Sequence, residues 1–309
     1  MKKTFKIVGI ILLSILIIIA LFFAGIFINN KLQLGREEKK IVPYGESVVI
    51  DGKKMNVQIS GNGSKTIVLL PGYMTAAPVI DFKPLIDELE KKVRVIVVEP
   101  FGYGLSEDTD TERSVEHLTE ELHKVLVMQG INKYTIMAHS ISGVYSLDYI
   151  HKYPHEVEAF IGIDSSLPSQ GGADDNNQGA IEWLSKSGLF RLLSNINADI
   201  LNIPDVGAVL GEQYKYLSLK NIGSKATMNE GKAMPENFNK TAEIQYPKNL
   251  PVLYFLATES TEPDDNWLKI HKDMVKNSEK SAIEILEGGH YLHHTQAKQI
   301  AELTAAFLE

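Results

Sequence analysis

The chain has 309 residues, of which 44% are hydrophobic, enough for a membrane segment and one large core. It contains no cysteine, which excludes disulfides, a thiol nucleophile and thiolate metal sites. The formal charge of −8 is uneven, because residues 1–44 hold seven Lys and Arg against two Glu. The remainder is therefore strongly acidic, and we expect it not to bind nucleic acid.

The N-terminus has the pattern of a membrane segment. The run from Ile7 to Ile28 carries no charge and is long enough to cross a bilayer, and no clear small-residue cleavage site follows it. We therefore expect an uncleaved single-pass anchor over residues 1–30 and a polar juxtamembrane linker over residues 31–44. A removed signal peptide is the alternative. Basic residues flank the run on both sides, and we expect the domain to lie outside the cell membrane.

From Gly45 onward the hydrophobic pattern alternates between strands and helices. Asp51-Gly52 predicts a tight hairpin, and the later alternation predicts a mostly parallel central sheet with helices on both faces. The expected strands are Ser47–Ile50, Lys54–Ser60, Thr66–Leu70, Val93–Val98, Tyr134–Met137, Ala159–Ile163, Val252–Leu256 and Ala282–Leu286. The expected helices are Val79–Lys91, Val115–Gln129, Gly143–Tyr153, Asn266–Val275 and Ala297–Leu308.

The alternation stops between Ser165 and Lys248. This stretch contains Gly171-Gly172 and several short helical patterns, including Ala180–Leu193. Loops at the carboxyl ends of parallel strands line the ligand sites of such sheets. We expect residues 165–248 to form a helical lid; an inert surface insertion is the alternative.

Ser140 stands where a short apolar strand meets the start of a helix. A serine at such a corner projects its hydroxyl from the end of the sheet, and the N–H of Ile141 is left free at a helix N-terminus. The corner is crowded, so the residues two before and two after the serine must be small. They are Ala138 and Ser142, in place of the usual glycines.

Four motifs in chain order resemble those of the α/β-hydrolase superfamily. They are the oxyanion loop Leu69-Leu70-Pro71-Gly72-Tyr73-Met74, the Gly-x-Gly loop Val98–Ser106 with Glu99 in place of Asp, the serine elbow Ala138–Gly143, and the histidine loop Gly288-Gly289-His290. The resemblance covers nearly all of residues 45–309. It implies an α/β-hydrolase fold with a catalytic Ser, acid and His in that chain order.

His290 is the candidate base, because a serine hydroxyl needs an adjacent base to attack and the two preceding glycines permit an exposed turn. His293 and His294 are competitors that lie further into the loop. A metal cluster of these three histidines is disfavoured, since no carboxylate spacing supports it. His139, next to the nucleophile, is expected to point away and act as packed support.

The acid is the point where this chain departs from the common family pattern. Ser260 occupies the position after the post-insertion strand where many members of the family carry Asp. Asp164, at the end of the strand before the insertion, resembles the acid of another part of the superfamily. Either strand can supply the acid, because a triad is defined by geometry. We expect Asp164, with Glu259 as the alternative.

The resemblance implies that the backbone N–H groups of Tyr73 and Ile141 hold the oxyanion. We expect a membrane-anchored serine hydrolase that cleaves a small carboxylic ester through an acyl-enzyme, without cofactor or metal. The alternatives are an aminopeptidase or amidase of the same fold, and a catalytically inactive binding or sensor module.

Overall fold

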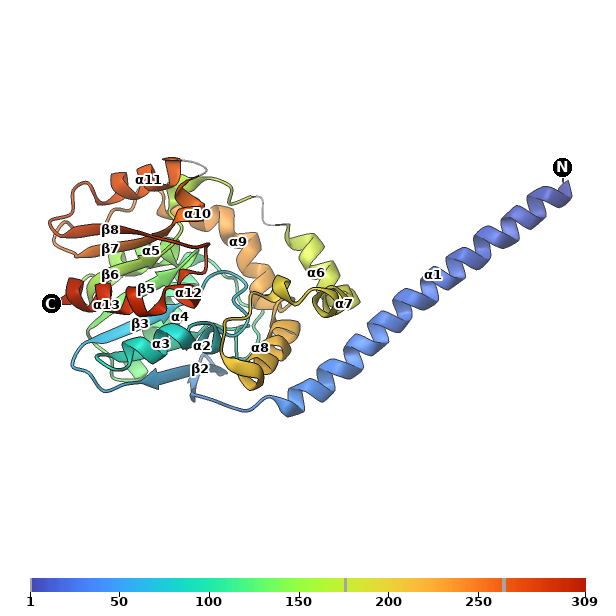
Figure 1. Ribbon diagram of the computed structural model, residues 1–309, viewed down its shortest axis with the longest axis horizontal. Helices are drawn as coiled ribbons and strands as arrows, with labels where there is room; N and C mark the ends of the chain where they lie inside the picture. The colour runs from blue at the N-terminus through green and yellow to red at the C-terminus, as the bar shows by residue number, and fades with distance from the viewer. Residues whose placement is uncertain (1, 175–176, 263–264) are drawn as a thin grey trace.

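One eight-stranded sheet organises the chain. A computed structural model describes residues 2–174, 177–262 and 265–309 (Figure 1). The strands are β1 (Glu46–Ile50), β2 (Lys53–Ser60), β3 (Thr66–Leu70), β4 (Arg94–Glu99), β5 (Tyr134–His139), β6 (Val157–Ile163), β7 (Val252–Ala257) and β8 (Ser281–Leu286).

The strand order in the sheet is β1-β2-β4-β3-β5-β6-β7-β8. β2 pairs antiparallel with both β1 and β4, and all other neighbours are parallel. The β1–β2 hairpin turns at Asp51 and Gly52, both with positive φ, as a two-residue hairpin of this kind requires. The predicted mostly parallel sheet is confirmed.

Helices cover both faces of the sheet. One face packs against α4 (Val115–Met128), α5 (Ser142–Lys152) and α11 (Asp265–Val275), and the other against α3 (Lys83–Leu89), α12 (Leu292–Thr295) and α13 (Ala297–Leu308). β3, β5, β6 and β7 lie inside the sheet and are apolar almost throughout, since both of their faces are buried.

The prediction of one continuous helix over Val79–Lys91 is wrong. The structure has α2 (Pro78–Asp81) and then α3, separated at Phe82. Pro84 is the physical reason, because proline has no N–H to donate and its ring clashes with the carbonyl four residues earlier. The break matters for the site, since it leaves Asp81 at the end of a short buried turn.

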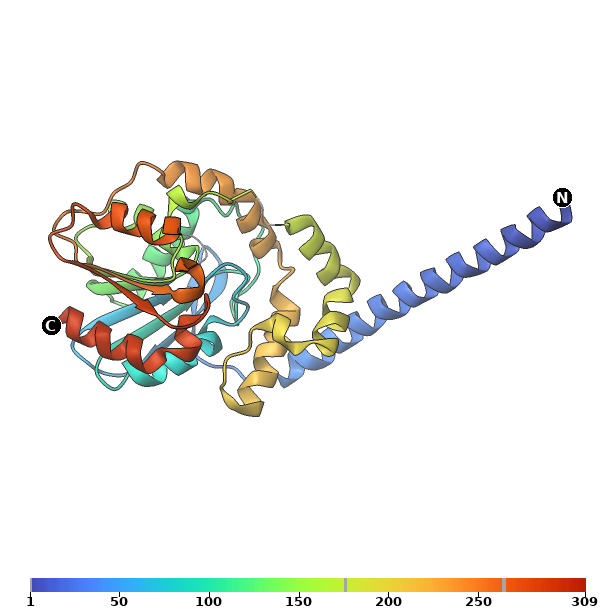
Figure 2. The same ribbon diagram turned by 45° about the horizontal axis from the view of Figure 1, so that its top comes forward.

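The segment between β6 and β7 is a helical insertion, referred to below as the insertion. Its helices are α6 (Gln178–Ser187), α7 (Leu189–Ile196), α8 (Gly207–Asn221) and α9 (Lys225–Thr241), with the short 3-10 turns η2 (Pro168–Gln170) and η3 (Ala198–Leu201). Gly188, with φ of 86°, separates α6 from α7, so the pattern Ala180–Leu193 is two helices. Figures 1 and 2 show α6, α7 and α8 between the sheet and the N-terminal helix.

The N-terminal helix α1 runs from Lys2 to Glu37, and a 3-10 turn, η1 (Glu38–Lys40), follows it. It is long and apolar enough to cross a membrane. Much of the segment expected to be a linker is therefore helical. Figure 1 shows the N-terminal part of α1 projecting away from the rest of the molecule.

Candidate active site

Ser140 occupies a strained corner between β5 and α5. Its φ is 54°, in the left-handed region that residues other than glycine rarely adopt. The corner is held from both sides: the Ser140 N–H donates to the Ile163 carbonyl at 3.3 Å, and the Ser140 carbonyl accepts from the N–H groups of Gly143 and Ser166. Strain fixed by surrounding hydrogen bonds is typical of functional sites.

The missing elbow glycines are compensated by local contacts. The Ser142 hydroxyl donates to the Pro71 carbonyl, which ties α5 to the loop after β3. Gly143 is the position that tolerates no side chain, because an added Cβ would lie 2.5 Å from the Ser166 carbonyl oxygen. Gly72 is also confined, since a Cβ there would lie 2.8 Å from His139 Nδ1 and 3.1 Å from the Cβ of Ser140.

Asp164 and His290 are joined directly. The distance between His290 Nδ1 and Asp164 Oδ2 is 2.7 Å. Asp164 is fully buried at the end of β6, whereas the His290 side chain is 41% exposed. The carboxylate therefore lies behind the ring, and the other side of the imidazole remains open. Asp164 also follows Ile163, the residue whose carbonyl holds the Ser140 corner.

Three further donors converge on the Asp164 carboxylate. They are the Ala257 N–H at 3.1 Å, the Trp267 indole N–H at 2.9 Å and the Ser260 hydroxyl at 2.7 Å. Burial raises the pKa of Asp164, but the hydrogen bonds from His290, Ser260 and Ala257 outweigh burial and leave the pKa below its usual value. Sequence reasoning missed Trp267, because nothing in its local pattern marks it.

Glu259, the alternative acid, lies in the short helix α10 (Thr258–Thr261). Its N–H donates to the Gly288 carbonyl at 3.2 Å, and its carboxylate lies beside Gly289. Among the residues that the structure describes, the carboxylate hydrogen-bonded to the His290 ring is that of Asp164. Glu259 thus contacts the backbone of the histidine loop at Gly288 and Gly289.

His139 supports the histidine loop from below, as expected from its position before the elbow. It is buried, and its Nε2 lies 3.0 Å from the His290 carbonyl oxygen. We assign the proton to Nε2, since a carbonyl can only accept. Burial holds the pKa of His139 well below its ordinary value, so the ring is neutral.

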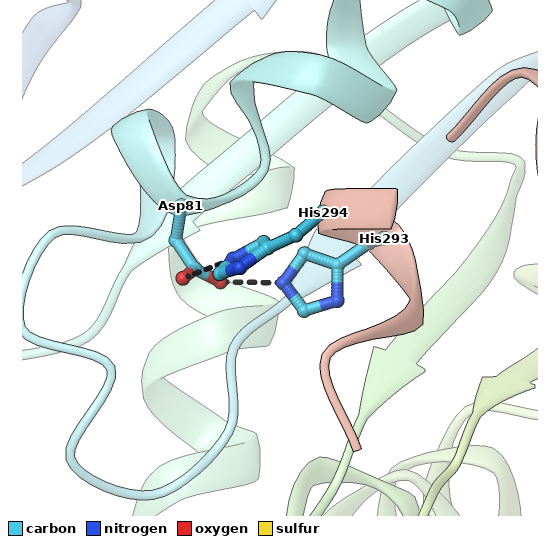
Figure 3. Close-up of side chains that lie close together, drawn as sticks. All are labelled: Asp81, His293 and His294. Carbon is cyan, nitrogen blue, oxygen red and sulfur yellow. Dashed lines mark hydrogen bonds and ion pairs between the residues drawn. The ribbon is translucent and has the colours of Figure 1, made fainter. Parts of the chain in front are cut away.

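A second buried cluster lies directly after His290. Asp81 accepts from His293 Nε2 at 2.7 Å and from His294 Nε2 at 2.9 Å (Figure 3). The Tyr214 hydroxyl of α8 donates to the same carboxylate at 3.4 Å. Burial acts to raise the pKa of Asp81, but His293 and His294 outweigh burial and hold the pKa well below its usual range.

The structure brings a carboxylate, that of Asp81, to His293 and His294, although no carboxylate spacing in the sequence indicated one. Asp81 was missed because it lies far away in sequence and meets α12 only through the break between α2 and α3. In the part of the chain that the structure describes, ligand atoms of Asp81, His293 and His294 all lie within 4.8 Å of one another, so these three residues could hold a metal ion. Their contacts are those of direct hydrogen bonds, which join α2, α12 and, through Tyr214, the insertion.

The backbone of the loop after β3 lies close to the serine elbow at Gly72. Within the described residues, neither the Tyr73 N–H nor the Ile141 N–H donates to another protein group. The next residue, Met74, has φ of 63°, and its N–H donates to the Tyr103 hydroxyl at 3.2 Å. Tyr103 in turn donates to Glu230 of α9 at 2.7 Å, so the insertion helps to fix this loop.

The Gly-x-Gly loop after β4 is organised around Glu99. Its buried carboxylate accepts from the hydroxyl of Tyr44, the amide of Asn56 and the N–H groups of Val79 and Leu105. Burial nevertheless raises the pKa of Glu99. Gly104 has φ of 50°, and a Cβ there would collide with the Glu99 carboxylate, so the glycine serves the turn.

Comparisons with known proteins show the family and the fold of the chain. A family model described as "Alpha/beta hydrolase family" matches residues 67–303. The chain is 28% identical over 322 residues to a relative from Bacillus subtilis (strain 168) named "Uncharacterized protein YbdG", and the match covers all of this chain and 99% of the relative.

Two solved structures illustrate the shared fold. Cfl2 from Burkholderia cenocepacia superposes with a TM-score of 0.67 at 16% identity, over 85% of this chain and 95% of Cfl2. The enol-lactonase from Burkholderia xenovorans LB400 has a TM-score of 0.64 at 15% identity, over 85% of this chain and 99% of that one. At these identities the likeness shows the fold alone.

Proposed function

Because the chain belongs to the alpha/beta hydrolase family, we propose that it is a membrane-anchored serine hydrolase that cleaves a small carboxylic ester. The observation that carries the proposal is the 2.7 Å hydrogen bond between Asp164 and His290, next to the strained Ser140 corner. A serine, a buried carboxylate and a histidine, in this chain order, are the parts of an acyl-transfer triad.

Ser140 Oγ is the nucleophile of the proposed reaction. The Nδ1–H of His290 donates to Asp164, which leaves Nε2 as the free base. Nε2 takes the hydroxyl proton as Oγ bonds to the acyl carbon, and then gives that proton to the leaving alcohol. Water, activated by the same nitrogen, hydrolyses the acyl-enzyme. The ionised Asp164 keeps the ring in the required tautomer and stabilises the imidazolium.

The unpaired N–H groups of Tyr73 and Ile141 are the proposed donors to the oxyanion. Gly72 allows the loop to approach Ser140, and Met74 and Ser142 fix the loop on either side of Tyr73. Preorganised donors of this kind typically contribute about 10²–10³ in rate each. The triad and the loop supply this chemistry without a cofactor.

The helix α1 is the proposed membrane anchor, with the hydrolase domain on the extracytoplasmic side and the insertion acting as its lid. Its length and its apolar surface support the anchor. Full-length protein should resist carbonate extraction, and protease added to intact cells should cut the domain. Mature protein starting near Asn29 in the medium would show a cleaved signal instead.

The test of the catalytic proposal is labelling with a fluorophosphonate probe. The unchanged protein should be labelled and should hydrolyse short acyl esters. Ser140→Ala should abolish labelling and lower kcat by roughly 10⁴–10⁶, by analogy with triad deletions. A folded Ser140→Ala protein that is still labelled would remove Ser140 from this role. An unlabelled, inactive parent protein would favour the binding or sensor module.

A further inference from the structure

The short helix α7 is amphipathic, but its polar side chains are buried and apolar side chains are exposed. Its buried side chains are polar, Arg191 and Ser194, whereas Leu193 is 44% exposed and Ile196 is 75% exposed. A helix on the surface of a water-soluble protein turns its apolar stripe to the core and its polar face to solvent. The outward apolar face of α7 therefore matches a medium other than water.

The polar face of α7 is occupied by contacts to α1. Arg191 pairs through both terminal nitrogens with the Glu37 carboxylate, Nη2 to Oε2 at 2.7 Å. Its Nε donates to Asn30 Oδ1 at 2.8 Å, and Asn30 is itself buried. These contacts fix the rotation of α7 about its axis. The polar face is turned to α1, so the apolar face of Leu193 and Ile196 is turned away from α1.

The contact also fixes the height of α7 along the anchor. Gly188, at the start of α7, lies against α1 so closely that an added Cβ would be 2.7 Å from Asn30 Cβ and 3.0 Å from the Ile26 carbonyl oxygen. Ile26 and Asn30 flank the end of the uncharged run that begins at Ile7. If that run spans the bilayer, α7 lies at the level where α1 leaves the hydrocarbon.

Neighbouring elements of the insertion also expose apolar side chains. Trp183 of α6, Ile200 of η3 and Val209 of α8 are all exposed. Tryptophan is enriched at the level of the lipid headgroups. On the C-terminal side of the apolar run, the first basic residue of α1 is Lys31, just beyond the span, where it can meet lipid phosphates.

We propose that the insertion is seated in the membrane that α1 spans, with the face of Leu193 and Ile196 buried in the headgroup and upper acyl region of the lipids. The occupant of this face is the bilayer itself. The inference rests on the proposed anchor function of α1, but not on the proposed chemistry. It places the hydrolase domain in a fixed orientation at the membrane surface.

The absence of cysteine allows a direct test, because one introduced thiol can be labelled alone. Full-length Ile196→Cys and, separately, Leu193→Cys would carry an environment-sensitive fluorophore in phosphatidylcholine vesicles that contain lipids with a nitroxide on the acyl chain. Val127→Cys is the matched control, since Val127 is also apolar and 51% exposed but lies on α4.

We expect both labels on α7 to emit at shorter wavelength and to be quenched at least about threefold more strongly than the Val127 label. Equal quenching at all three positions would overturn the inference, and so would a blue-shifted label on α7 that the lipid quencher cannot reach, which indicates a second protein copy. Flotation of the protein with the vesicles separates the proposal of the α1 anchor from that of the membrane-seated insertion. If the protein does not float, both proposals fail. If it floats but all three labels are quenched equally, only the seating of the insertion fails.

Discussion

At the scale of single residues, Asp164 and Ser260 show how the acid can follow β6, the neighbour of β7, after which many family members carry Asp. The two side chains lie at the carboxyl ends of β6 and β7, and the Ser260 hydroxyl donates to Asp164 Oδ2 at 2.7 Å. The position that carries Asp in many family members therefore carries a hydrogen-bond donor to the acid. Burial raises the pKa of Asp164, but His290, Ser260 and Ala257 outweigh burial and hold that pKa below its usual value, so the carboxylate stays ionised.

Replacing each of the two candidate acids by its amide tests this arrangement. Asp164→Asn should lower kcat by up to about 10⁴, because an amide favours the wrong imidazole tautomer. Glu259→Gln should change kcat by less than about tenfold, since its carboxylate lies beside the backbone of Gly289. Steady-state hydrolysis of a short nitrophenyl ester measures both variants. The reverse order of effects would assign the acid to Glu259.

Gly143 is expected to be irreplaceable for packing at the elbow. The Cβ of Gly143→Ala would lie 2.5 Å from the Ser166 carbonyl oxygen, so the variant should lose about 1–3 kcal/mol of unfolding free energy. Gly179→Ala on α6 is the control, because its Cβ would meet nothing within 4 Å. Pulse proteolysis of the full chain compares them. Equal stability of both variants would contradict the close approach of α5 to Ser166.

At the scale of elements, the insertion joins three parts of the molecule. Glu230 of α9 accepts from Tyr103 and from Tyr145 of α5. Tyr214 of α8 reaches the buried Asp81. Arg191 of α7 holds α1. Each contact is polar and buried or partly buried, so its geometry is specific, and the insertion lies in a defined place rather than as a loose surface loop.

Removing the Arg191 side chain should release α7 from α1. Arg191→Ala removes the partner of the buried Asn30 Oδ1 and of the partly buried Glu37 carboxylate, and breaking a buried pair typically costs about 3–5 kcal/mol. Hydrogen–deuterium exchange over residues 178–196 of the full chain should become faster. Lys186→Ala, which removes an exposed pair with Glu182, should leave exchange nearly unchanged. The docking would be refuted if both variants exchanged alike.

On the scale of the whole molecule, the sheet brings the chemistry to one edge. The strands β3, β5, β6 and β7 are parallel, so Ser140, Asp164, α10 and the loop that contains Tyr73 all follow their carboxyl ends. The histidine loop after β8 completes the edge. The buried His139 lies beneath this edge, with its Nε2 at 3.0 Å from the His290 carbonyl oxygen.

Acid should destabilise the protein in part through His139. The folded-state pKa of His139 lies well below 6.5, so below pH 6.5 the unfolded chain binds the proton first. His139 therefore stabilises the fold fully above pH 6.5, and that stability is lost at about 1.4 kcal/mol per pH unit below it. Denaturant unfolding between pH 7.5 and 5.5 measures the slope.

His139→Asn should give a shallower slope than the unchanged protein, and His155→Asn, at an exposed position, should keep the original slope. A slope that is the same in all three proteins would mean that His139 takes up its proton in the folded state.

The sequence alone determined the features that are encoded locally. The apolar run of α1, the Asp51-Gly52 hairpin, the strand-to-helix corner at Ser140 and the glycines before His290 could each be predicted from a few neighbouring residues, because turn chemistry and hydrophobic periodicity act over short distances. The order of these motifs was enough to predict the fold. The residues after two of the predicted strands supplied two candidate acids, Asp164 and Glu259.

Only the tertiary structure decided which side chains meet. Asp164 rather than Glu259 contacts the His290 ring, Trp267 and Ser260 surround that acid, Asp81 joins His293 and His294, and Arg191 binds α1. These partners lie far apart in the chain, and their contact depends on strand register, on the break at Phe82 and on the rotation of α7. Burial and packing fix those quantities for the molecule as a whole, so no local pattern contains them.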